Sequence, residues 1–340
     1  MPDRIRDAVP LSRRGALLAG AACGVAAVGR PYLAYGASPV TLKLAQPDST
    51  LHPFQRMFEA FGKDVEEKTG GEVRVRVYGG GQLGSSANIV SGVGTGTVDI
   101  VVHTAGFFSS YYPRMQILDL PFLFPDEPSA ERVLAGSTGS GIFQSLTEKG
   151  VAGLCWGHHG WRVTETTNKA IMAPADLDRL KVRIQQSPIF AAMFKAVGAV
   201  PVVLDVAELY LALSQNAVQA AEIPLSSVVA SKLHEVISHV SLTNHVYNAS
   251  AMLMNKQKLD GLGQKNGDIV RELALALSPK WRMVSAESSG EARKACEAKG
   301  IKFNTVDYKQ FRDRMQSVYD EFRGPLGPEN VDRILKETTA

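Results

Sequence analysis

Segments with the pattern of strands and helices alternate through the first third of this chain. Residues 41–45, 72–78 and 98–102 have the pattern of strands, and residues 54–68 and 86–93 have the spacing of helices. Strands that alternate with helices form βαβ units, in which each helix covers the sheet between two strands. The order therefore predicts an α/β unit that begins near residue 41.

The rest of the chain continues this organisation. Pro279 lies in a long helical stretch, where it marks a kink or a junction. The glycine- and proline-rich residues 324–328 interrupt the last helices. The other predicted elements are an apolar segment at 118–124, a helix at 129–134, a strand at 151–156, a second α/β unit over about 161–246, and one or more long helices over 268–300.

The first 37 residues differ from all that follows. A basic start precedes residues 15–29, an uncharged run of small and apolar residues that is too short for a membrane span. We interpret residues 1–37 as a cleaved signal peptide, which predicts a periplasmic protein. Residues 12–18 resemble a twin-arginine signal. The general secretory route and a lipid anchor at Cys23 are the alternatives.

Charge excludes some classes of partner once this leader is removed. The leader holds five arginines and two aspartates, so the mature chain carries 32 basic and 32 acidic residues. A neutral balance gives no argument for binding nucleic acid or an anionic membrane. No second long apolar segment follows, which predicts no stable membrane insertion. About 300 residues is large for one core and suggests two lobes.

The sequence offers no pattern for a metal or a cofactor. Cys155 and Cys296 lack metal-type spacing, and they are either bridged or buried as free thiols. His158 and His159 are neighbours whose side chains point in different directions, so we expect structural roles for both. No motif for nucleophilic catalysis or zinc hydrolysis occurs. We predict no metal, no cofactor and no enzymatic activity.

A glycine run at residues 79–84 matches the G-x-G-x-x-G fingerprint of dinucleotide sites, and Asp99 follows at the expected spacing. The strand before it argues against a nucleotide. Arg74 and Arg76 require one face of that strand to meet water, whereas the first strand of a doubly wound sheet is buried on both faces. We interpret the glycines as a tight turn between strand and helix.

Arg183 is the strongest candidate for binding. It lies in the alternating run of residues 180–185, which predicts a short strand ahead of a helix that starts near Pro188. A guanidinium stays charged and presents a fork of donors that matches two carboxylate oxygens. The alternative is a surface or interdomain ion pair, because charged side chains usually lie on solvated faces.

A set of motifs around Arg183 resembles the solute-binding proteins of tripartite ATP-independent periplasmic (TRAP) transporters, of the DctP type. The resemblance covers nearly all of the mature chain, and the landmarks occur in the family's order. They are residues 58–71, 81–84, 96–99, 120–124, 160–164, 198–201, 208–213, 220–224 and 255–256.

The resemblance implies an α/β fold of two lobes, with crossing hinge strands and a long lobe-spanning helix. Lobe I would comprise residues 38–160 and about 248–285. Lobe II would comprise about 161–247 and 286–340, with the C-terminal helices. The family binds small organic acids between the lobes and delivers them to a small and a large membrane subunit, so these subunits are the implied partners.

Arg183 would hold the ligand carboxylate, and Arg162 matches a second arginine that commonly contacts substrate in this family. This chain has Ile223, Val206, Thr104 and Ser86 where sugar-acid binders of the family have more polar or aromatic residues. Loss of those contacts predicts a cleft that is apolar beyond the carboxylate, because an unsatisfied polar group costs about 1 to 3 kcal/mol. The stacking candidates are Trp161, Phe107 and Phe108.

We therefore predict capture of an apolar or aromatic monocarboxylate or a 2-oxo acid. Two alternatives stay within binding: a C4-dicarboxylate held by Arg183 and Arg162 together, and a sensor that presents its closed form to a receptor. A third alternative is a periplasmic enzyme acting on a carboxylated substrate. Such an enzyme would have only Glu222 and Tyr210 near Arg183 as reactive groups, and both are structural in the binding interpretation.

Overall fold

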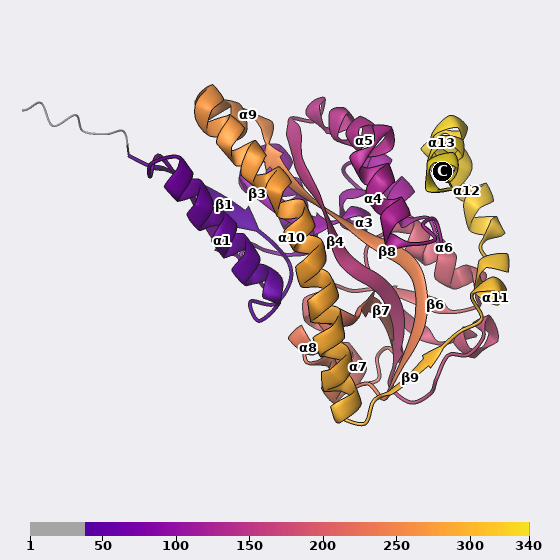
Figure 1. Ribbon diagram of the computed structural model, residues 1–340. Coiled ribbons are helices and arrows are strands. Elements are labelled where there is room, and N and C mark those ends of the chain that lie inside the picture. The colour runs from indigo at the N-terminus through magenta and orange to yellow at the C-terminus, as the bar shows by residue number, and fades with distance from the viewer. Residues whose placement is uncertain (1–37, 340) are drawn as a thin grey trace, which may run out of the picture. The chain divides into compact units, whose positions relative to one another are not determined.

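The computed structural model describes residues 38–339, which form a mixed α/β structure around a nine-stranded sheet (Figure 1). The predicted signal peptide lies outside the described residues. The strands are β1 (Val40–Ala45), β2 (Val73–Tyr78), β3 (Ile100–Thr104), β4 (Val151–Thr166), β5 (Lys181–Ile184), β6 (Val200–Val203), β7 (Ala220–Pro224), β8 (His239–Asn255) and β9 (Lys302–Thr305). Their order in the sheet is β2-β1-β3-β8-β4-β7-β5-β6, and β9 pairs with β8.

Helices account for most of the remaining chain. The α-helices are α1 (Pro53–Lys68), α2 (Ser86–Thr95), α3 (Ala105–Phe108), α4 (Glu127–Ala135), α5 (Ser137–Thr147), α6 (Pro188–Ala196), α7 (Val206–Ser214), α8 (Leu225–Ala230), α9 (Lys256–Gly261), α10 (Gly263–Ala298), α11 (Tyr308–Asp313), α12 (Gln316–Leu326) and α13 (Pro328–Thr339). Three short 3₁₀ helices are η1 (Pro113–Asp119), η2 (Pro174–Leu177) and η3 (Leu233–Glu235). The α/β class and the alternation of β1, α1, β2, α2 and β3 are confirmed.

Two long antiparallel strands, β4 and β8, join the halves of the sheet. The start of β4 pairs with the end of β8, next to β3, and the end of β4 pairs with the start of β8, next to β7. These are the crossing strands that the resemblance implied. The strand predicted at 151–156 is shorter than β4, which continues to Thr166. The regular alternation is interrupted because the register shifts between His158 and Trp161, where Gly160 has a φ of 95°. The predicted bounds of the two lobes remain a prediction.

The long helix α10 packs against β4 and against two helices, α1 and α8, which pack on β2 in one half of the sheet and on β7 in the other (Figure 1). Pro279 lies inside this helix without ending it. Its deepest side chain is Trp281, which is fully buried and meets Phe54 and Phe58 of α1 edge-on. A Cβ on Gly157 of β4 would lie 2.2 Å from the Trp281 ring. The helix can therefore lie this close to the sheet only because residue 157 has no side chain.

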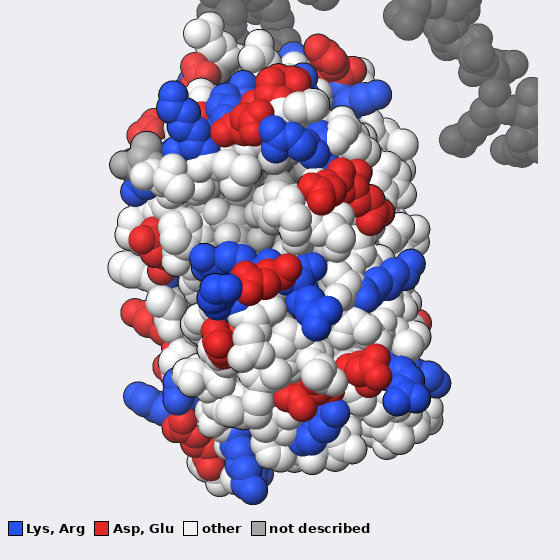
Figure 2. Space-filling view, turned by 90° about the vertical axis from the view of Figure 1, so that its right-hand side faces the viewer, with Lys and Arg blue, Asp and Glu red and all other residues white. Residues whose placement is uncertain are grey.

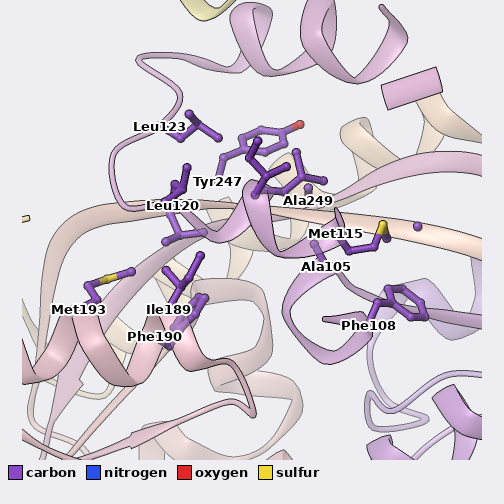
Figure 3. Packing of buried hydrophobic residues seen from close by; sticks show 14 of the residues in the cluster. Ala105, Phe108, Met115, Leu120, Leu123, Ile189, Phe190, Met193, Tyr247 and Ala249 are labelled. Atoms are coloured by element: carbon purple, nitrogen blue, oxygen red, sulfur yellow. The ribbon is translucent and has the colours of Figure 1, made fainter. Parts of the chain in front are cut away.

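Apolar packing fixes the position of β5, the strand that carries Arg183. Val182 and Ile184 lie on one face of β5 and belong to a large buried cluster with Ile189 and Phe190 of α6. Figure 3 shows part of that cluster, in which the α6 residues lie beneath Leu120. Because side chains alternate along a strand, the same packing turns Arg183 to the opposite face.

Several smaller expectations can be compared with the structure. β2 is an edge strand followed by a turn in which Gly80, Gly81 and Gly84 have positive φ, as expected for a strand-to-helix connection. Cys155 and Cys296 are both buried and free. On the face shown in Figure 2, basic and acidic side chains are interspersed without a large area of one sign. Among the described residues no helix is long and apolar enough to cross a membrane.

The contact between α10 and β4 gives a stability prediction. Gly157→Ala would force a methyl group against Trp281, and overpacking of this kind destabilises a protein by about 1 to 3 kcal/mol. Chemical denaturation should show this decrease. The matched control is Gly290→Ala in α10, the helix that carries Trp281. A Cβ at residue 290 meets no atom within 4 Å. This control should leave stability unchanged or raise it by up to about 1 kcal/mol, since alanine favours helix. Equal stability of both variants would contradict the close packing.

Candidate functional site

A narrow cavity of about 40 Å³ lies where β3, β4, β5 and β7 approach the start of α7. Six of the seven residues predicted to bind ligand line it: Thr104, Phe107, Arg162, Arg183, Val206 and Ile223. A wider cavity of about 690 Å³ shares Pro47 and Val206 with it and is lined by the loop at Ser49–Leu51 and by α7. The fold thus brings segments from distant parts of the sequence to one small cavity.

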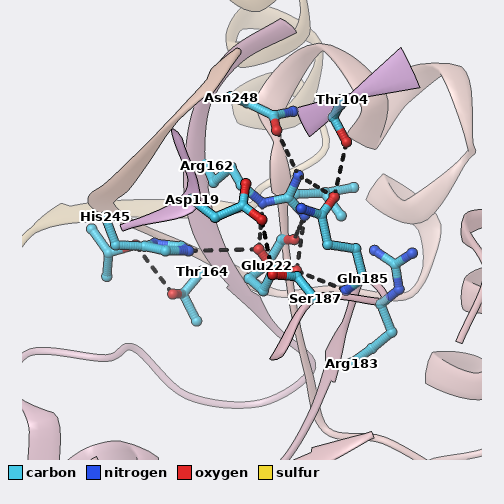
Figure 4. A network of polar contacts seen from close by, with 12 residues as sticks. Thr104, Asp119, Arg162, Thr164, Arg183, Gln185, Ser187, Glu222, His245 and Asn248 are labelled. Carbon is cyan, nitrogen blue, oxygen red and sulfur yellow. Dashed lines mark hydrogen bonds and ion pairs between the residues drawn. The ribbon is translucent and has the colours of Figure 1, made fainter. Parts of the chain in front are cut away.

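Arg183 is buried, at 2% exposure, yet most of its guanidinium is unused. Its Nε donates to the carbonyl oxygen of Leu204 at 2.9 Å, and its two terminal nitrogens have no hydrogen-bond or ion-pair partner among residues 38–339 (Figure 4). Burial lowers the pKa of Arg183 to about 10, while Glu222 acts against this shift. The side chain therefore remains a cation at neutral pH with a free fork of donors at the cavity.

Arg162 is equally buried, but its guanidinium is fully occupied. Nε and Nη2 form a two-point ion pair with the carboxylate of Glu222 on the neighbouring strand β7, and Nη2 also donates to the Glu222 carbonyl oxygen. Nη1 donates to Gln185 Oε1 at 3.4 Å and to Asn248 Oδ1 at 3.2 Å. All five donors thus have protein acceptors, and the ring of Phe190 lies 5.0 Å from the guanidinium carbon.

The pKa values of two fully buried glutamates near the cavity are shifted in opposite directions. Burial alone would raise the pKa of Glu222, but Arg162 and the adjacent His245, whose Nε2 lies 3.6 Å from Glu222 Oε2, hold this pKa below its ordinary value. Burial and the charge of Glu222 raise the pKa of Glu165 well above its ordinary value. Glu222 is therefore the ionised partner of Arg162, whereas the carboxyl of Glu165, which accepts from the Ile223 backbone N–H at 3.2 Å, has no cationic partner among the described residues and is shifted toward its protonated form.

The aromatic candidates divide between cavity and core. Phe107 lines the cavity, with its ring centroid 4.1 Å from that of His103. Trp161 does not line it. It follows Gly160 on β4, packs edge-on against Tyr247 at 5.3 Å and belongs to the edge of the apolar core. Phe108 is completely buried in the same core. Ser86 also lies outside the cavity.

Eight lining residues were not predicted to bind ligand: Pro47, Asp48, His103, His159, Gln185, Pro224, Ser227 and Asn248. Gln185 follows Arg183 by two residues and so shares its face of the strand, a signal that the alternation already contained. His159 was assigned a structural role, but its Nε2 lies 3.2 Å from Ser227 Oγ at the cavity. The place of Asn248 depends on the irregular register of β4 and β8, which the sequence does not show.

The described residues contain no group of three or more histidine, cysteine, aspartate or glutamate side chains that could hold a metal ion. What the cavity offers instead is the unpaired cation of Arg183, several polar side chains, and one carboxylate, Asp48, which lies 3.4 Å from His159 Nε2. Such a lining can bind an anion, and a carboxylate has the geometry that a guanidinium fork matches in two points.

Comparison with known proteins agrees with this geometry. The family model for bacterial extracellular solute-binding proteins, family 7 (DctP), matches residues 44–324. The chain belongs to this family. It is 32% identical, over 77% of its length and 80% of the relative's, to the 2,3-diketo-L-gulonate-binding periplasmic protein YiaO of Escherichia coli (strain K12). It is 28% identical, over 97% of both chains, to the C4-dicarboxylate-binding periplasmic protein DctP of Rhodobacter capsulatus.

Solved structures of TRAP periplasmic solute-binding proteins have the same fold. One from Sulfitobacter sp. NAS-14.1, with bound β-D-galacturonate, has a TM-score of 0.85 and 26% identity and covers 88% of this chain and 100% of its own. One from Sulfurospirillum deleyianum DSM 6946, with bound succinate, has a TM-score of 0.82 and 27% identity, covering 88% and 99%. The two-lobe TRAP binding-protein fold is confirmed, and family members are substrate-binding proteins of transporters, not enzymes.

The two buried glutamates give a paired stability prediction at neutral pH. Glu222→Gln should destabilise the protein by about 3 to 5 kcal/mol, because it leaves Arg162 buried without its counter-charge. Glu165→Gln should instead stabilise it. A carboxyl whose folded pKa is raised favours folding below its unfolded pKa and costs stability as the pH rises above that value.

Chemical denaturation at pH 4 and pH 7 tests both. The advantage of Glu165→Gln over the native chain should be present at pH 7 and shrink at pH 4. The loss in Glu222→Gln should also shrink at acid pH, because stability from a lowered pKa disappears as the native carboxylate becomes protonated. Destabilisation of both variants to the same extent at pH 7 would contradict the opposite pKa shifts.

Proposed function

We propose that this protein captures a small organic acid for a TRAP transporter and holds the ligand carboxylate on Arg183. The observation that carries the proposal is the free fork of Arg183, a buried cation whose terminal nitrogens have no partner among residues 38–339. A buried charge without a partner is costly, so an anionic ligand that supplies one gains much of its affinity there. A lysine could supply the charge but not the two-point geometry.

The proposed ligand is a monocarboxylate or a 2-oxo acid with an apolar part. Val206, Ile223 and Phe107 line the cavity beside Arg183 and supply apolar contact. A C4-dicarboxylate, the alternative, would need a second free cation. Arg162 does not favour it, because Glu222, Gln185 and Asn248 already accept from all five of its donors. A sugar acid would have to replace those apolar contacts with hydrogen bonds.

Three polar contacts support a mechanism in which the cavity opens and closes. Ser86 donates to Asp205 from its backbone nitrogen at 3.0 Å, and Thr104 donates to Gln185 Oε1 at 3.1 Å. Ser187 donates to Asp119 Oδ2 at 2.8 Å. Each contact joins segments assigned to different predicted lobes. A ligand that touches both sides would favour the closed state, and the closed state would then be recognised by the membrane subunits.

The cellular setting of the proposal follows from the family and the leader. The relatives from Escherichia coli and Rhodobacter capsulatus are named as periplasmic proteins. We propose export of this chain by its cleaved N-terminal signal, through the twin-arginine route, followed by delivery of ligand to the small and large membrane subunits.

Arg183→Lys tests the anchor. Titration calorimetry with a panel of monocarboxylates, 2-oxo acids, succinate and sugar acids should find at least one tight monocarboxylate or 2-oxo acid. The variant should weaken it by about a hundred-fold or more, since charged hydrogen bonds in a buried site contribute about 1.5 to 3 kcal/mol each.

The control is Arg179→Lys, an exposed arginine on the same segment whose ion pair with Asp178 is solvated. It should bind like the native chain. Thermal unfolding should show that both variants fold. Native affinity in Arg183→Lys would contradict the anchor, and tight binding of sugar acids alone would contradict the proposed ligand class.

A further inference from the structure

The cavity beside Arg183 has spare hydrogen-bond donors. His103, Gln185 and Asn248 line it and are almost fully buried, at 4%, 1% and 3% exposure. In each, one nitrogen has no hydrogen-bond partner among the described residues: His103 Nε2, Gln185 Nε2 and Asn248 Nδ2. Buried polar groups in native proteins are normally paired, so three unpaired nitrogens on residues that line one cavity need an explanation.

Arg162 fixes the orientation of the two amides. A guanidinium can only donate, so the atoms that receive Nη1 must be the amide oxygens of Gln185 and Asn248 (Figure 4). The Thr104 hydroxyl also donates to Gln185 Oε1, which agrees with this assignment. Each amide oxygen therefore already accepts a hydrogen bond, and the NH₂ group of each side chain is the group without a partner among the described residues. Glu222 in turn holds Arg162 from the opposite side.

The tautomer of His103 is fixed in a similar way. Its Nδ1 accepts a hydrogen bond from the Thr104 backbone N–H at 2.8 Å, so the ring proton must lie on Nε2. Burial lowers the pKa of His103 to about 3, and the ring is therefore neutral at physiological pH. His103 thus offers an N–H donor without a charge.

All three spare groups are therefore donors, and the fork of Arg183 adds more. The other polar groups at the cavity already have partners: the Thr104 hydroxyl donates to Gln185, and the Ser227 hydroxyl and the Asp48 carboxylate both contact His159 Nε2, at 3.2 and 3.4 Å. A carboxylate can satisfy Arg183 alone. The remaining donors need another acceptor. A keto oxygen fits them best, because it only accepts hydrogen bonds, whereas a hydroxyl group would also need an acceptor for its own proton.

We propose that Gln185, Asn248 and His103 determine ligand specificity by binding a keto oxygen that the ligand carries beside its carboxylate. Arg162 is then a positioning residue, which turns both amides so that their NH₂ groups are free. This inference rests on the proposed function and narrows its ligand class to 2-oxo acids. In this inference the buried Arg162 orients other side chains and does not contact the ligand.

Matched acids test the inference in the native chain. Pyruvate, L-lactate and propionate share three carbons and one carboxylate and differ only in a keto oxygen, a hydroxyl group or neither. Phenylpyruvate, phenyllactate and phenylpropionate repeat the series with a larger apolar body. Calorimetry should give the 2-oxo acid an affinity at least about ten-fold above that of the plain acid in the series that binds, because the plain acid leaves the donors unpaired.

Two variants remove the donors one at a time. Gln185→Met and Asn248→Leu keep similar volumes and lose the NH₂ group. Each should lower the affinity of the 2-oxo acid by about five-fold or more and leave that of the plain acid nearly unchanged. Gln144→Met, at an exposed position of α5, is the control and should keep the native ratio. A variant that weakens all acids equally, or keeps the native ratio, would overturn the specificity role.

Arg162→Lys tests the positioning role. Lysine keeps the charge but cannot hold Glu222 and both amide oxygens at once. The ratio of 2-oxo to plain acid should therefore fall while the plain acid still binds through Arg183. A folded variant with the native ratio would overturn this role. If the variant does not fold in thermal unfolding, Gln185→Met and Asn248→Leu still decide the inference.

The outcomes separate this inference from the proposed function. Equal affinities within a series in the native chain would overturn the keto-oxygen site alone and leave Arg183 as the anchor. Binding of none of the six acids would overturn the proposed ligand class and this inference with it. Tighter binding of the 2-hydroxy acid than of the 2-oxo acid would assign the donors to a hydroxyl group and would also contradict the inference.

Discussion

The buried ion pair between Arg162 and Glu222 organises the site. It joins β4 to β7 at the point where β4 crosses from one group of strands to the other. Because Glu222 is fully engaged by Arg162 and by His245, it does not neutralise Arg183 by direct contact. Arg162 and Arg183 are thus both buried near the Glu222 carboxylate, but only Arg162 forms an ion pair with it. The second cation remains for a ligand.

The crossing strands explain how such a site can be both buried and accessible. β4 and β8 carry Arg162, His159 and Asn248 at the middle of the sheet, while β3 and β5 bring His103 and Arg183 from either side. α10 lies along the whole arrangement, and its Trp281 packs directly on the glycine of β4. A hinge made of continuous strands and one long helix can bend without breaking the sheet. In the proposed mechanism, the few polar contacts around the cavity are exchanged for water when it opens.

The sequence predicted much of this because its local patterns were strong. Alternation through 180–185 placed Arg183 on a strand face, and the same rule would have found Gln185. Neighbours on a strand point to opposite faces, so Trp161 and Arg162 could not both line one cavity unless a bulge intervened. Asn248 and His103 were not visible, because their positions depend on strand pairing over 90 to 150 residues of sequence and on the register shift near Gly160. The pairing of Arg162 with Glu222 was missed for the same reason.

The central claim is that Arg183, and not Arg162, receives the ligand carboxylate. A crystal structure of the protein with a bound 2-oxo or monocarboxylic acid tests it most directly. The account predicts both carboxylate oxygens within hydrogen-bond distance of the two terminal nitrogens of Arg183, with the ion pair between Arg162 and Glu222 intact. A carboxylate seated on Arg162 with Glu222 displaced, or a ligand that leaves the Arg183 fork unpaired, would contradict it.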